Sequence, residues 1–95
     1  MTKVIATRPS QHALEELGVK NWPMQSSEVA IYPQHYEEKE TCYLLEGEAD
    51  IVVGEDRMTV HAGDLVIFSA GMDCIWEVHH PITKRYQVGK LACTE

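Results

Sequence analysis

Beyond residue 27 the chain alternates between short runs rich in β-branched and aromatic residues and short segments of turn residues. Such runs are typical of β-strands, and glycines such as Gly54, Gly63 and Gly71 supply turn conformations that other side chains resist. Gly47 is likewise expected to open a tight turn between two strands. Seven strands are predicted, over residues 28–32, 40–45, 48–53, 57–60, 65–68, 74–78 and 84–88. This spacing indicates a closed or sandwiched all-β unit.

The first 24 residues follow a different pattern. A short helix is predicted over residues 11–17, because the hydroxyl of Ser10 can accept from an early amide and Gly18 supplies a left-handed stop. Trp22 precedes Pro23, which cannot donate to a sheet. We therefore expect this segment to lie as an arm across the β-unit rather than inside it.

Length and charge narrow the possible functions. Ninety-five residues suffice for one small domain. We expect that domain to span 1–95, with helix and arm in 1–24, strands in 27–88 and a poorly fixed tail in 89–95. A formal net charge of −7, with eight Lys and Arg residues that form no cluster, argues against a nucleic-acid partner. No apolar run of about twenty residues and no secretory leader occur, so no membrane partner is expected.

The three cysteines, Cys42, Cys74 and Cys93, are odd in number and form no CxxC pair. This usage fits a reducing compartment, so we expect free thiols and a cytoplasmic protein. If Cys42 and Cys74 lie near each other inside the fold, a bridge between them is sterically allowed but not required.

Alternate residues of a strand face the same way. Glu40, Cys42 and Leu44 therefore share one face of their strand. On a later strand, Cys74, Trp76 and Val78 share a face in the same manner. An ionised Glu40 inside an apolar fold needs a partner, and Lys84 and Tyr86 are the first candidates.

Two segments, 40–47 and 63–74, resemble the two-part cupin signature. Nearly the whole chain up to Val88 is similar to small single-domain cupins related to the (S)-ureidoglycine aminohydrolase cupin domain, of the cupin 3 type. The other segments that carry this resemblance are residues 17–23, 36–48, 62–66, 70–71, 74–78 and 84–86. The resemblance implies a double-stranded β-helix, or jelly-roll barrel, with a short N-terminal helix and arm. It keeps the signature's Glu40 but places Ser69 where the pattern has proline and Cys74 where it has histidine.

In cupins with an intact metal site, two upstream histidines join the glutamate and the later histidine. Here one spacing puts Gln34 and Tyr36 at the upstream positions, and the other puts Pro33 and His35 there. The resemblance favours the tyrosine alignment, whose ligands would bind a divalent metal poorly. We therefore expect no cofactor. The alternative is a site of His35, Glu40 and Cys74 for zinc, nickel, manganese or iron.

Two kinds of function follow for such an interior. In the first, a binding module holds a small polar metabolite in the barrel, lined by Tyr36, Glu40, Cys74, Trp76, Lys84 and Tyr86. In the second, a small enzyme uses Glu40 as acid or base, with or without a metal. Cys74 is a candidate nucleophile only if its pKa is lowered, and a small buried hydrophobe is the simpler interpretation.

The remaining aromatic and histidine residues are assigned structural roles. His79 and His80 adjoin Pro81 and are expected in a solvated turn. The arm around Trp22 is expected to pack, and it is the natural element to exchange in a homodimer, because small barrels often cover an exposed sheet edge by pairing.

Overall fold

Two long curved strands organise the fold in the computed structural model, which describes residues 4–89. The elements are β1 (Val4–Thr7), α1 (Gln11–Leu17), the 3₁₀ turn η1 (Val19–Asn21), β2 (Met24–Ser27), β3 (Ala30–Tyr36), β4 (Glu40–Val53), β5 (Asp56–His61), β6 (Leu65–Phe68) and β7 (Met72–Val88). The predicted tail falls almost entirely outside the described residues.

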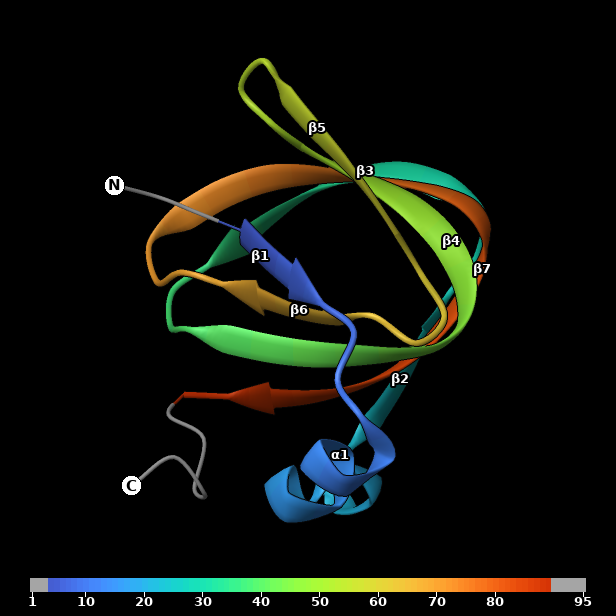
Figure 1. The fold of residues 1–95 in the computed structure, drawn as a ribbon. Coiled ribbons are helices and arrows are strands. Elements are labelled where there is room, and N and C mark those ends of the chain that lie inside the picture. Colours follow the sequence, from blue (N-terminus) through green and yellow to red (C-terminus); the bar gives the residue numbers. More distant parts are fainter. Residues whose placement is uncertain (1–3, 90–95) are drawn as a thin grey trace.

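The strands form one antiparallel sheet in the order β1-β6-β4-β7-β2, with β3 paired to β7 and β5 paired to β4. Because β4 and β7 are long, each changes partner along its length. β4 pairs first with β6 and then with β5, while β7 pairs first with β3 and then with β2. The sheet curls back on itself in Figure 1, which confirms the predicted all-β barrel.

Two predicted breaks are wrong. Residues 40–45 and 48–53 form one strand, and Gly47 does not open a tight turn but lies where the β4–β7 register shifts. At this bulge the backbone of Gly47, with φ of +99°, is pressed against the backbone of Pro81. Residues 74–78 and 84–88 also join in one strand, so His79 and His80 lie within β7 rather than in a turn.

The N-terminal helix is confirmed. The Ser10 hydroxyl accepts from the amide of Ala13 at 3.1 Å, and Gly18 ends the helix with φ of +72°. The following segment was only partly anticipated, because Met24 begins strand β2 on the edge of β7. β1 was missed as well, since four residues carry little pattern of their own.

Trp22 is buried within its own chain, in a small second core on the outer face of the sheet with Val19 and Leu65. The packing role expected for it is therefore present. In the described range, 4–89, no helix is long and apolar enough to cross a membrane.

The main core fills the inside of the barrel. It draws alternate residues from each strand, as the period of two requires. Its members are Tyr36, Cys42, Leu44, Ala49, Ile51, Val60, Val66, Phe68, Met72, Cys74, Trp76, Val78 and Ile82.

Candidate functional site

The start of β4 and the end of β7 form the mouth of the barrel. In the antiparallel register Cys42 lies opposite Tyr86 and Leu44 opposite Lys84, so these side chains share the inner face. Exposure rises outward along both strands. Leu44 and Cys42 are fully buried and Glu40 is partly exposed, whereas on β7 exposure increases from Lys84 through Tyr86 to Val88. The inner face therefore reaches solvent beside Glu40.

An aromatic stack lies behind the mouth. The ring of Tyr36 stacks on Phe68 with centroids 4.4 Å apart. Trp76 is tilted against Phe68, with ring centroids 5.8 Å apart. The Trp76 indole Nε1 donates to the Tyr36 hydroxyl at 2.9 Å. Burial raises the pKa of Tyr36 far above its usual range, although the Trp76 hydrogen bond opposes this. Tyr36 is thus held as a neutral phenol.

Lys84 is the basic residue of this interior. It is only 5% exposed, and its Nζ lies 4.2 Å from the centroid of the Trp76 ring. Over residues 4–89, no carboxylate lies within salt-bridge distance of this ammonium. Glu40, its expected partner, is close enough for the charge of Lys84 to matter but does not form an ion pair with it.

Burial also governs the acidic groups of the interior. It raises the pKa of Glu40, and the positive charge of Lys84 opposes part of that rise. Burial raises the pKa of Cys42 to about 12 and that of Cys74 to about 11, again with Lys84 opposing. Both are free thiols, so the allowed bridge is not formed. A nucleophilic Cys74 would require a lowered pKa, whereas its pKa is raised. Cys74 therefore lies in the environment of a small buried hydrophobe.

We predict that both thiols resist alkylation in the folded protein. A rise from the ordinary 9.0 to about 11 lowers the thiolate fraction of Cys74 at pH 8 by about 100-fold. In a Cys93→Ser background, iodoacetamide followed by peptide mass mapping measures each rate with and without urea. Labelling of native Cys74 within tenfold of its unfolded rate would contradict this assignment.

The alternative metal set is not assembled. His35 is half exposed, and its Nδ1 lies 2.7 Å from Oδ1 of Asp73. Strand alternation puts His35 on the face of β3 opposite to Tyr36. The structure therefore does not bring His35 to Glu40 and Cys74. The other alignment offers a neutral phenol and a protonated thiol, which do not fit a divalent metal.

A different group of possible metal ligands lies on the outer face, and sequence reasoning missed it. Oxygen and nitrogen atoms of Asp50, Glu77 and His79 lie within 4.8 Å of one another. The guanidinium of Arg57 already bridges two of them, at 2.9 Å from Asp50 and 2.5 Å from Glu77. Thr59 also donates to Asp50 at 2.7 Å. The guanidinium of Arg57 thus balances one of the two negative charges of this cluster.

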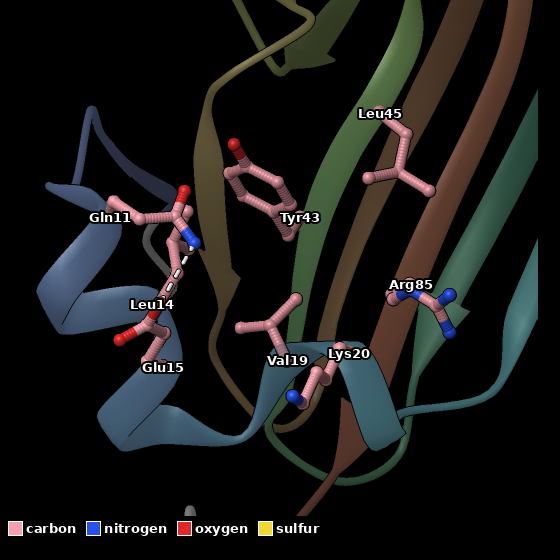
Figure 2. A pocket seen from close by; sticks show the side chains of 8 residues that line it. All are labelled: Gln11, Leu14, Glu15, Val19, Lys20, Tyr43, Leu45 and Arg85. Carbon is pink, nitrogen blue, oxygen red and sulfur yellow. Dashed lines mark hydrogen bonds between the residues drawn. The ribbon is translucent and has the colours of Figure 1, made fainter.

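A pocket of about 290 Å³ also lies outside the barrel, between α1, η1 and the outer faces of β4 and β7 (Figure 2). Its lining is mixed, with apolar side chains beside the charges of Glu15, Lys20 and Arg85. Arg85 donates to the carbonyl of Trp22 at 2.8 Å, which ties the arm to β7. The sequence could not indicate this pocket, because it forms only where the helix packs on the sheet.

Comparison with known proteins agrees with this architecture. Residues 14–86 match the model of the EutQ-like cupin domain. The crystal structure of a DUF861 family protein from Thermotoga maritima is similar, with a TM-score of 0.88 and 34% identity over 90% of this chain and 99% of that one. No curated protein matches the chain in sequence.

More distant structures share the fold. A DUF1255 protein from Acidithiobacillus ferrooxidans has a TM-score of 0.63 and 25% identity, over 65% of this chain and 60% of that one. The EutQ protein of Clostridium difficile has a TM-score of 0.67 over 96% of this chain and 71% of that one. At 15% identity the second likeness shows the fold alone. The match over most of the strands and the DUF861 relative together establish that this chain belongs to the EutQ-like cupin domain family.

Proposed function

We propose that this protein is a binding module that holds a small polar metabolite at the mouth of its barrel. The site would be lined by Tyr36, Glu40, Cys74, Trp76, Lys84 and Tyr86. The observation that carries the proposal is the gathering of a phenol, an indole N–H and an ammonium inside an otherwise apolar core, with the carboxyl of Glu40 at its partly exposed edge. Buried polar groups are costly, and a few of them among aromatic walls are typical of ligand sites.

The indole N–H groups provide a direct test. The chain has two tryptophans. Trp76 lies in the proposed site and Trp22 in the second core. In a ¹H–¹⁵N spectrum, the indole N–H signal of Trp76 therefore reports on the site, and that of Trp22 serves as an internal reference. Trp22→Phe assigns the two signals. We expect at least one of acetate, acetamide, urea and glycerol to shift the Trp76 signal saturably while the Trp22 signal stays fixed. Shifts of both together, or of neither, would reject the proposal.

A small enzyme that uses Glu40 as acid or base is the second candidate. The observation in its favour is the raised pKa of Glu40, since general acids and bases need such tuning. The finer resemblance to the ureidoglycine aminohydrolase cupin domain stays a prediction and supplies no reaction here. A homodimer also stays a prediction, and light scattering at micromolar concentration tests it.

Glu40→Gln is expected to stabilise the fold at neutral pH. Because the folded-state pKa of Glu40 is raised above the ordinary 4.5, ionisation opposes folding as the pH rises through the folded value. Glutamine mimics the protonated form and removes that cost, although it also loses the weaker attraction to Lys84. The melting temperature of Glu40→Gln should exceed that of the wild type at pH 8, and the difference should vanish near pH 4.

The control is Glu37→Gln at an exposed position. It should show no such pH-dependent gain. A melting temperature of Glu40→Gln below that of the wild type at pH 8 would mean that the attraction to Lys84 outweighs burial.

A further inference from the structure

We propose that the ligand of the barrel mouth is a compact monoanion of the carboxylate type, bound by the ammonium of Lys84 together with the hydroxyl of Tyr36. The inference rests on the proposed function, since it assigns a ligand class to the same site. It starts from a buried cation, Lys84, that lies over an aromatic ring and has no carboxylate within salt-bridge distance among the described residues.

Lys84 is a buried lysine. A lysine is almost never fully buried unless it is paired, because its ammonium loses hydration. The contact with the face of Trp76 offsets part of that loss. In the region from residue 4 to residue 89, no carboxylate completes the neutralisation. The site is therefore short of one negative charge.

A negative charge bound by Lys84 would lie between β4 and β7. The positive charge of Lys84 acts on Glu40, Cys42 and Cys74, so the ammonium lies among side chains of both β4 and β7. Both thiols are held protonated by burial and cannot serve as counter-ions. Glu40 stands at the partly exposed mouth, outside salt-bridge distance. An anion that entered past Glu40 would pass Cys42 and Tyr86 before it met the ammonium of Lys84.

The hydroxyl of Tyr36 is the second donor of the proposed site. Tyr36 and Lys84 contact the same indole, one at Nε1 and the other over the ring face. Because the Tyr36 oxygen accepts from Trp76, its own proton remains available, and within residues 4–89 no acceptor for it is seen. The Trp76 indole thus has an ammonium over its face and a phenol hydroxyl at its Nε1 edge. Two such donors match the two oxygens of a carboxylate.

The size and charge of the ligand follow from the surroundings. The buried side chains of Cys42, Leu44 and Trp76 surround Lys84, so the bound group must be compact. One cation balances one negative charge. A dianion such as phosphate would remain under-neutralised beside Glu40, which favours a monoanion.

Acetate and acetamide are the matched probes, because they differ in charge and hardly in shape. We expect acetate to shift the Trp76 indole N–H signal saturably, and acetamide to leave it unchanged over the same concentrations. Lys84→Met should weaken acetate binding at least tenfold. Lys20→Met, which removes an exposed lysine of the outer pocket, should leave it unchanged.

The outcomes separate the two proposals. If acetamide binds as tightly as acetate, or if Lys84→Met binds acetate like the wild type, the ligand class is refuted while the binding site stands. If neither these probes nor urea nor glycerol moves the Trp76 signal, the proposed function itself fails. An unchanged Trp22 signal verifies folding of Lys84→Met. Should that variant not fold, Tyr36→Phe replaces it, with the same expected loss for acetate.

Discussion

Replacing Gly47 by alanine is expected to destabilise the fold severely. A Cβ at this position would lie 2.8 Å from the carbonyl carbon of Pro81, closer still to its oxygen, and 2.9 Å from the oxygen of His80. These are backbone atoms of the adjacent strand, so relief requires β4 and β7 to separate. The φ of +99° adds conformational strain. We expect a loss of at least about 3 kcal/mol, which lowers the melting temperature by more than about 12 °C.

Gly71→Ala is the matched control. Gly71 also has a positive φ, of +79°, but nothing lies within 4 Å of a Cβ built on it. Its substitution should therefore cost only the conformational term of roughly 1–2 kcal/mol. Urea unfolding followed by circular dichroism measures both variants. Equal losses in the two would show that strand contact with Pro81 contributes nothing beyond backbone conformation.

Trp76→Ala is expected to have an effect of similar size. The indole is 1% exposed and packs against Phe68 at the centre of the barrel. Truncating a buried tryptophan typically costs about 3–5 kcal/mol through lost burial and the cavity left behind. Here the change also strips Tyr36 of its donor and Lys84 of its aromatic neighbour. Small domains have about 5–15 kcal/mol of total stability, so the variant should be only marginally folded.

Trp76→Phe separates packing from polar contacts. Phenylalanine keeps an aromatic ring in the barrel but cannot donate to the Tyr36 hydroxyl. It should therefore lose clearly less stability than Trp76→Ala in the same urea measurement. If the two substitutions cost the same, the indole N–H and not the packed ring would dominate the contribution of this residue.

Much of the fold followed from local patterns. Ser10 and Gly18 bounded the helix correctly, because capping depends on residues a few positions apart. The run at 65–68 matched β6. Alternation also grouped Cys42 with Leu44 and Cys74 with Trp76, each pair on one face of its strand, and all four side chains are buried. The resemblance to cupins led to the right family.

The errors lie where distant segments meet. Glycine at position 47 indicated a turn, yet its role is to let Pro81 approach across the sheet, 34 residues along the chain. His35 looked like a metal ligand by spacing, but strand facing placed it outside the barrel with Asp73. The cluster of Asp50, Arg57, Glu77 and His79 joins three strands and has no sequence signature.

The sequence by itself determined the all-β class, the short capped helix and which residues share a face of each strand, because hydrophobic period and capping act over a few neighbouring residues. Only the tertiary structure decided that β4 and β7 run unbroken, and that Tyr36 and Lys84 meet on one indole. Those contacts depend on strand register, which many cooperating long-range pairs set together and which no local pattern encodes.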